Sequence, residues 1–223
     1  MIDCVFMLND LNGIDVADDS DVALGYNDCS DNGSNGIGFW DYSVGDVYSN
    51  TCNSNAYNGI QGDDGSYITA EDNECSQNGS NGISFWGDSI GEVYGNTCDS
   101  NEYNGIAATD DAEITAEGNY CWYNGWSGID LSSYAVGDIT GNSCKFNSED
   151  GISVYDNAEA TVDDNLCLDN TEAGIWFGDF ATGSASNNEC AGNHWGIYVD
   201  ATSWPVIYTN NNLHNNTIDY YEE

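Results

Sequence analysis

The chain has 223 residues, of which 39 are acidic and one, Lys145, is basic, so its formal net charge is −38. Such a charge repels phosphate backbones and anionic headgroups, which excludes nucleic-acid binding through a basic patch and attachment to a membrane surface. Low hydrophobicity with high charge is typical of disordered chains, but 7 Trp, 15 Tyr and 6 Phe supply material for a folded core. No run approaches the ~20 apolar residues of a membrane-spanning helix, and the first residues lack the features of a signal peptide.

Regularly spaced cysteines divide the chain into repeats. After a first interval of 25 residues, every interval between cysteines is 23 residues. Each repeat follows the pattern N-x-C-x-x-N-x-x-x-G-I, which indicates a repeat architecture over the whole chain. We expect an irregular first coil in residues 1–28, regular coils in 29–211 and a truncated coil or cap in 212–223, with Asn212 in the cysteine position. The cysteines are Cys4, Cys29, Cys52, Cys75, Cys98, Cys121, Cys144, Cys167 and Cys190.

Within each repeat, short segments alternate apolar and polar residues, as in residues 83–85 and 91–94. Alternation with period two predicts β-strands, and the Gly, Asn, Asp and Ser clusters between them predict turns. Three short strands per repeat would form one coil of a parallel β-helix, with coils stacked about 4.8 Å apart.

Stacking turns each repeated position into a column along the rod. The Ile and Cys columns, and the column two residues after Ile, are expected to point inward, with the cysteines as buried free thiols. Asparagines two residues before and three residues after each cysteine are expected to form hydrogen-bonded ladders, because stacked amides can bond from coil to coil.

This pattern resembles the repeats of right-handed parallel β-helix proteins of the pectate-lyase-like superfamily. The resemblance implies an all-β fold, a single-stranded right-handed parallel β-helix of about nine coils of 23 residues. It implies no single function, because the superfamily includes polysaccharide lyases, polygalacturonases, epimerases, phage tailspikes and adhesins.

Catalytic residues of the kinds that this resemblance suggests are not evident. Lyases of the superfamily use Arg or Lys as a base beside Asp-bound calcium, and the only candidate is Lys145, whose coil has no acidic cluster of its own. Hydrolases need paired carboxylates, and adjacent aspartates such as Asp63 and Asp64 recur as turn residues instead of breaking the repeat in one place. The sequence therefore predicts no catalytic residues and no enzyme.

A column of aspartates four residues after Ile is the candidate metal site. Stacked carboxylates repel, and Ca²⁺ with its preference for oxygen ligands would offset that repulsion. Diffuse counter-ions are the alternative explanation, so Ca²⁺ is a candidate and no cofactor is certain. The column comprises Asp18, Asp41, Asp64, Asp110, Asp156 and Asp179.

Rows of outward aromatic residues are the candidate carbohydrate surface. They could stack against sugar rings or pack on one another along the rod, and packing is the interpretation that the sequence favours. These residues are Trp40, Trp86, Tyr155, Tyr57, Tyr103 and Trp126.

Apolar clusters at residues 5–8 and 218–221 suggest head-to-tail association of copies into a filament. We therefore expect a non-catalytic structural rod, extracellular or on the cell surface. A carbohydrate-binding or carbohydrate-processing β-helix is the alternative, with a polysaccharide as partner, and an acidic mimic of nucleic acid is a minor one.

Overall fold

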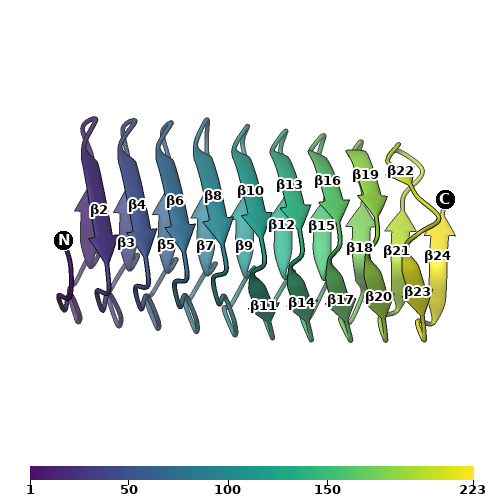
Figure 1. Cartoon of the computed structure of the whole chain (residues 1–223), viewed down its shortest axis with the longest axis horizontal. Helices are drawn as coiled ribbons and strands as arrows, with labels where there is room; N and C mark the ends of the chain where they lie inside the picture. The colour runs from purple at the N-terminus through teal and green to yellow at the C-terminus, as the bar shows by residue number, and fades with distance from the viewer.

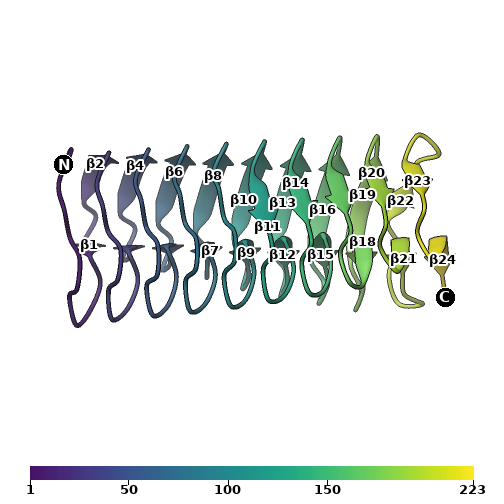
Figure 2. The ribbon, with the colours of Figure 1, turned by 90° about the horizontal axis from the view of Figure 1, so that it is seen from below.

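The computed structural model describes residues 1–223, which form one parallel β-helix with the two termini at opposite ends of a rod (Figure 1). Successive coils stack side by side along the rod, as the perpendicular view also shows (Figure 2). The chain contains no helix, and hence none long and apolar enough to cross a membrane. The predicted all-β solenoid of 23-residue coils is confirmed.

Three parallel sheets run the length of the rod. The ten-stranded sheet comprises β1 (Ile14–Val16), β3 (Ile37–Phe39), β5 (Ile60–Gly62), β7 (Ile83–Phe85), β9 (Ile106–Ala108), β12 (Ile129–Leu131), β15 (Ile152–Val154), β18 (Ala173–Phe177), β21 (Trp195–Val199) and β24 (Ile218–Glu222). The nine-stranded sheet comprises β2 (Asp21–Gly25), β4 (Val44–Tyr48), β6 (Tyr67–Glu71), β8 (Ile90–Tyr94), β10 (Glu113–Glu117), β13 (Val136–Thr140), β16 (Glu159–Asp163), β19 (Thr182–Ser186) and β22 (Val206–Ile207). The five-stranded sheet comprises β11 (Tyr120–Trp122), β14 (Ser143–Lys145), β17 (Leu166–Leu168), β20 (Glu189–Ala191) and β23 (Asn212–His214).

Strand pairing keeps each repeated position in register. Ile129 pairs with Ile152, and Cys121 pairs with Cys144, each 23 residues further along the chain. The five-stranded sheet begins only at Tyr120, and earlier coils make a single bridge at that place, as between Thr51 and its partner in the next coil.

The interior consists of the predicted columns. All cysteines are free thiols, and all but the half-buried Cys4 are buried. Burial raises the pKa of the Cys75 thiol well above its ordinary value, so this thiol remains protonated. The Cys column is therefore a row of small apolar core residues, as predicted.

Coils of two types alternate along the rod, and the alternation follows from packing volume. In some coils the position two residues after Ile holds a phenylalanine. The strand of the nine-stranded sheet in the same coil then holds a glycine, as Phe85 and Gly91 show. A Cβ atom added at Gly91 would lie 2.4 Å from the Phe85 ring, so no larger residue fits there. The next coil reverses the pair, with Ala108 and Ile114 both buried. The total side-chain volume inside each coil therefore stays similar, because the large and the small residue exchange positions from one coil to the next.

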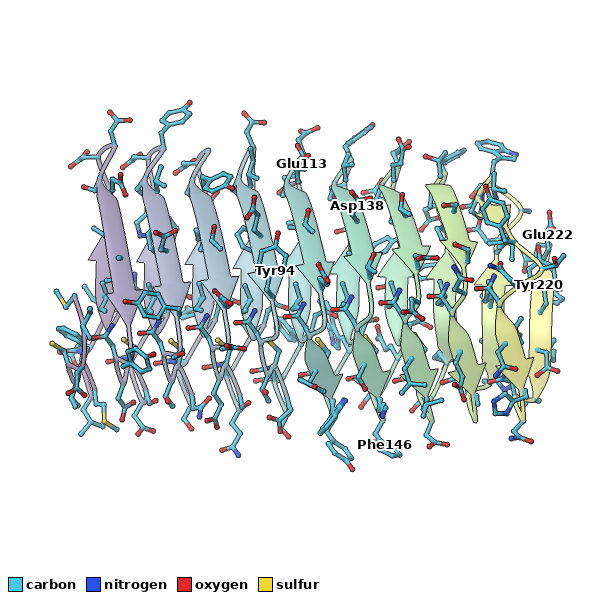
Figure 3. The ribbon with its side chains drawn as sticks, in the orientation of Figure 1. Tyr94, Glu113, Asp138, Phe146, Tyr220 and Glu222 are labelled. Carbon is cyan, nitrogen blue, oxygen red and sulfur yellow. The ribbon has the colours of Figure 1, made fainter.

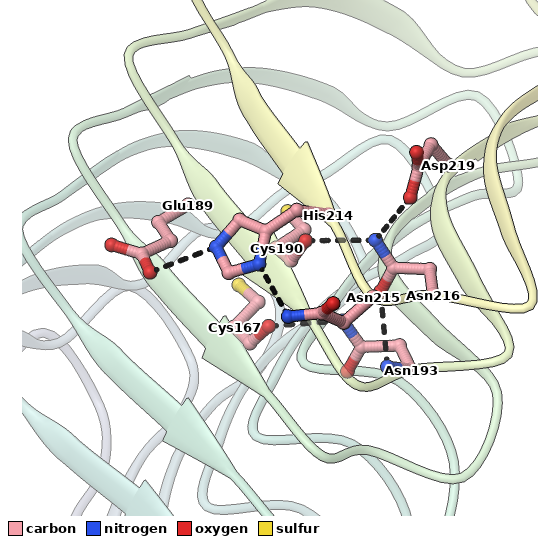
Figure 4. A network of polar contacts seen from close by, with 8 residues as sticks. All are labelled: Cys167, Glu189, Cys190, Asn193, His214, Asn215, Asn216 and Asp219. Atoms are coloured by element: carbon pink, nitrogen blue, oxygen red, sulfur yellow. Dashed lines mark hydrogen bonds and ion pairs between the residues drawn. The ribbon is translucent and has the colours of Figure 1, made fainter.

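The asparagine ladders are also confirmed. The backbone N–H and the Nδ2 of Asn96 both donate to Oδ1 of Asn119, at 2.9 and 3.1 Å, and the pattern recurs along the rod. Its last steps include the bond from Asn193 Nδ2 to Asn216 Oδ1 (Figure 4). A third column was not predicted: in it the N–H of Asn104 donates to Oδ1 of Asn81.

The prediction that Asn212 occupies the last cysteine position is wrong. Leu213 pairs with Cys190, and Asn212 pairs with Glu189. The segment between β22 and β23 is one residue longer than the equivalent segment of the preceding coil, and this restores the 23-residue spacing that the shorter eighth repeat had lost. Residues 218–222 form β24, an added edge strand of the ten-stranded sheet.

Acidic side chains cover the nine-stranded sheet on its outer face. Glu113 and Asp138 project from β10 and β13 into solvent, where Figure 3 shows them. Tyr94 and other aromatic residues lie between the carboxylates on this face.

Candidate functional site

A groove of about 600 Å³ runs over the outer face of the ten-stranded sheet, in the size range typical of ligand sites. Gln61, Ala107 and Asp130 lie at its floor, because the middle residue of each of these short strands points away from the core. The lining residues extend from Ala56 to Tyr155, about four coil spacings or about 20 Å along the rod.

The groove is walled by aromatic side chains. Trp86 and Tyr155 follow their strands and form one wall, while Tyr57, Tyr103 and Trp126 come from the turns before the strands and form the other. The rings of Tyr103 and Trp126 stack with their centroids 4.4 Å apart. The structure thus brings five of the six predicted carbohydrate-surface residues together in one groove.

These rings retain exposed surface although some pack on one another. The side chains of Tyr57 and Trp126 are 59% and 44% exposed. Trp86 is 42% exposed and is held by a hydrogen bond of 2.6 Å from its Nε1 to Ser84 Oγ. The packing predicted from the sequence and a surface available to a ligand therefore coexist.

Trp40, the sixth candidate, lies outside the groove. Its ring covers Gly38, and its Nε1 donates to Asp15 Oδ1 at 3.1 Å. At the opposite end of the groove, Trp176 lies over Gly178 and stacks with Tyr155, the ring centroids being 5.3 Å apart.

A smaller cavity of about 260 Å³ adjoins the groove and shares Trp126, Asp130 and Tyr155 with it. It holds two buried acids, Asp130 and Asp150, which are 8% and 7% exposed. Both cavities are continuous at Asp130, so this carboxyl group faces the aromatic walls as well as the second acid.

Burial raises the pKa of Asp130 to about 7, even though Ser153 Oγ donates a hydrogen bond of 2.7 Å to its Oδ1. Burial likewise raises the pKa of Asp150 to about 7, against the hydrogen bond of 2.7 Å that the Ala173 N–H donates to its Oδ1. A carboxyl group with a pKa near neutrality can both donate and accept a proton at physiological pH.

Neighbouring titratable groups in the two cavities also have raised pKa values. Burial, and next the charge of Asp130, raise the pKa of Tyr155 to about 12, so the Tyr155 phenol remains protonated. Burial followed by repulsion from Glu172 raises the pKa of Glu149, which also lines the smaller cavity. The site therefore offers a protonated phenol and carboxyl groups poised between their two forms.

Sequence reasoning missed both buried acids, although each breaks its column. Asp130 stands in a column that holds Ser84 and Ala107 in the preceding coils. Asp150 stands where Asn104 lies in the third asparagine column. These two substitutions, in neighbouring coils, were the available signal.

The aspartate column predicted to bind metal lies on tight turns outside the groove. All six of its residues have a positive φ, between 49 and 58°, a conformation that Asp tolerates better than most residues. Asp41, Asp64 and Asp110 line one shallow hollow. No group of three or more His, Cys, Asp or Glu side chains in the chain is arranged to hold a metal ion. Calcium binding there remains a prediction, and backbone conformation already accounts for the aspartates.

Comparison with known proteins now adds to this geometry. The family model described as a right-handed β-helix region matches residues 1–121 and 81–222. No curated protein matches the chain in sequence.

Solved structures of two epimerases share the fold. A mutant of the periplasmic alginate epimerase AlgG is 14% identical, with a TM-score of 0.70 over 89% of this chain and 61% of that one. The A-module of a mannuronan C-5 epimerase from Azotobacter vinelandii is also 14% identical, with a TM-score of 0.65 over 95% of this chain and 72% of that one. The chain thus spans less than two thirds of the AlgG structure.

The prediction that the chain is not an enzyme is corrected by these comparisons, because the similar structures over most of its length are those of carbohydrate-modifying enzymes. The argument behind that prediction, that the paired aspartates recur with the repeat, did not include Asp130 and Asp150, which depart from it. At 14% identity the likeness itself establishes the fold.

Proposed function

Because the chain belongs to the right-handed β-helix family, we propose that its groove binds a polysaccharide and that Asp130 and Asp150 transfer protons to and from the bound sugar. The observation that carries this proposal is the position of two buried acids, each with a pKa near 7, one at the floor of the aromatic groove and the other in the cavity that adjoins it. The likeness to alginate and mannuronan epimerases supports it, because those enzymes also process carbohydrate on this fold.

The binding step relies on the aromatic walls. The apolar faces of sugar rings can lie against the exposed rings of Tyr57, Trp86 and Trp126, of which Trp86 is held by its hydrogen bond and Trp126 by stacking. Aromatic side chains bury large areas at little conformational cost, which makes them suitable for an extended ligand that lacks charge-based anchors.

The chemical step relies on the carboxyl groups. Asp130 can protonate an oxygen atom of a sugar seated in the groove, while an ionised carboxylate nearby can accept a proton. Enzymes that act on glycosides commonly use one carboxyl group of raised pKa as the acid and a second carboxyl group as the base or nucleophile.

A polysaccharide panel tests the proposal. The purified chain would be incubated with neutral and acidic polysaccharides, and three products would be measured: new reducing ends, unsaturated sugars by ultraviolet absorbance, and inverted sugar centres by proton NMR. Asp150→Asn restores the asparagine of the third column, so we expect it to fold while activity falls at least about 100-fold. Asp138→Asn, which changes an exposed residue of β13, is the matched control. The absence of product and of binding for every polymer would refute the proposal.

Two further proposals concern the location of the protein and the association of its copies. We propose an extracellular, cell-surface or periplasmic location, which the description of one similar structure as periplasmic supports and cell fractionation would test.

We also propose end-to-end association, which the exposure of Val5 and Leu8 at one end and of Tyr220 and Tyr221 at the other supports. Light scattering at high and low salt would test it, and a monomer in both conditions would contradict it.

A further inference from the structure

The groove contains no cationic side chain. Together, the groove and the adjoining cavity are lined by three carboxyl groups, those of Asp130, Glu149 and Asp150, and by no Lys, Arg or His residue. Any anionic group on a ligand would therefore meet carboxyl groups and neutral dipoles, and no counter-charge.

The lysine and the two histidines of the chain lie outside the groove and contact other residues. Lys145 is on β14 of the five-stranded sheet, with its Nζ 5.7 Å from the centre of the Trp122 ring. His214, on β23 of the same sheet, contacts Glu189 at 3.2 Å (Figure 4). His194 packs edge-on against an adjacent indole, with the ring centroids 4.1 Å apart, in the coil before β24.

The net charge of the whole molecule also opposes the binding of anionic ligands. A net charge of −38 repels polyanions as they approach, and salt screens this repulsion over a Debye length of about 8 Å at physiological ionic strength. Sites that bind anions normally provide Arg, Lys or a helix N-terminus, and this chain has no arginine and no helix.

The remaining lining groups suit an uncharged sugar. Gln61 places an amide at the floor of the groove, and Ser132 Oγ donates to Thr109 Oγ1 at 3.2 Å on the wall. The buried amides of Asn58, Asn81 and Asn104 also line the groove, where they are bonded within the third asparagine column. Amides and hydroxyls both donate and accept hydrogen bonds, as sugar hydroxyl groups do. The aromatic walls supply contact area that is independent of charge.

We infer that the groove selects polysaccharides whose sugars are uncharged, and discriminates against polyuronates in their ionised form. The inference rests on the proposed function and names the substrate class for the same site. It also separates this chain from the alginate and mannuronan epimerases with which it shares its fold.

Matched ligands test the inference. Oligomers of galacturonic acid, mannuronic acid and glucuronic acid would each be prepared as the free acid, the methyl ester and the carboxyl-reduced sugar, and binding measured by calorimetry. We expect each acid to bind at least about ten-fold more weakly than its reduced form at low ionic strength, with the ratio shrinking as salt is added. The ester separates the effect of charge from the effect of the added oxygen atom.

Variants of the protein provide the reciprocal test. Gln61→Lys adds a cation to the floor of the groove and should lower the ratio between the affinities for reduced and acid forms several-fold. Thr161→Lys makes the same change in net charge on the exposed face of β16 and should leave the ratio almost unchanged.

The possible failures can be distinguished. If the acid forms bind as tightly as the reduced forms at low salt, or more tightly, the inference is wrong while the groove remains a polysaccharide site. If Gln61→Lys and Thr161→Lys change the ratio equally, local selectivity in the groove is refuted. If no oligomer in any form binds, and no neutral polymer of the panel does, the proposed function fails and the inference fails with it.

Discussion

Replacing Asp150 by asparagine should stabilise the protein, and increasingly so as the pH rises. The repeat makes this substitution mild, because Asn104 occupies the same column and its Oδ1 accepts a hydrogen bond of 2.9 Å from the Ser127 N–H. Asp150 Oδ1 accepts the equivalent bond, of 2.7 Å, from the Ala173 N–H. Asp150→Asn therefore removes the titrating group and keeps the contact.

The magnitude follows from the pKa. Burial raises the pKa of Asp150 from 3.8 to about 7, a difference of about 3 units, and each unit corresponds to about 1.4 kcal/mol. A raised pKa favours the protonated folded state, so the stability present below pH 3.8 is lost as the pH rises through 7. The loss reaches about 2 kcal/mol at pH 5 and about 4 kcal/mol at pH 8.

Urea unfolding at pH 5 and pH 8 would measure this difference. We expect Asp150→Asn to be more stable than the natural protein at both values, with a gap about 2 kcal/mol larger at pH 8. Asp138→Asn removes an exposed carboxylate from the same highly charged molecule and corrects for general repulsion. A stability gap for Asp150→Asn that is independent of pH, or no larger than that of the control, would refute the argument that this carboxyl is buried at a cost.

Three further predictions concern the scaffold. Cys98→Ser places a hydroxyl in the fully buried thiol column and should destabilise by about 1 to 3 kcal/mol in urea unfolding, whereas unchanged stability would place the column outside the core. Asn119→Ala leaves the N–H and Nδ2 of Asn96 without their shared acceptor and should lower stability by about 3 kcal/mol, and a loss below about 0.5 kcal/mol would show that water replaces the ladder. Removing salt should lower the Tm through repulsion between carboxylates, and Ca²⁺ should restore it better than Na⁺ at equal ionic strength if the aspartate column binds metal; identical recovery would indicate screening alone.

The fold could be predicted because it is determined by what the coils have in common. Ile129 and Ile152 pair across adjacent coils, and so do Cys121 and Cys144, which makes the interior a direct stack of identical residues. The error at Asn212 arose where the spacing changes: one residue lost before Ile197 is regained between β22 and β23, and the sequence alone did not locate the gain.

The site could be predicted only in part, because it depends on departures from the repeat. The aromatic rows were identified from their spacing, but their meeting in one groove depends on small floor residues such as Ala107, which allow the walls to stand above the sheet. Asp130 and Asp150 differ from the residues of neighbouring coils in charge while leaving the backbone register unchanged. Aspartates such as Asp64 recur at the turns for conformational reasons, so a single aspartate elsewhere in a coil is not distinctive in the sequence.

A solenoid can acquire such a site at a small structural cost. The outward residues of the ten-stranded sheet do not pack in the interior, so exchanging one of them leaves the Ile and Cys columns intact. The position of an acid along the rod then determines how deeply its carboxyl group is buried, and hence its pKa. Asp15 and Asp130 share one column, yet Asp15 is exposed in the first coil, whereas Asp130 is buried beside Trp126 and Tyr155 in the middle of the rod. Burial beside the aromatic walls that would hold a sugar thus also raises the pKa of Asp130, so the proposed binding and the proposed proton transfer would be coupled in one groove.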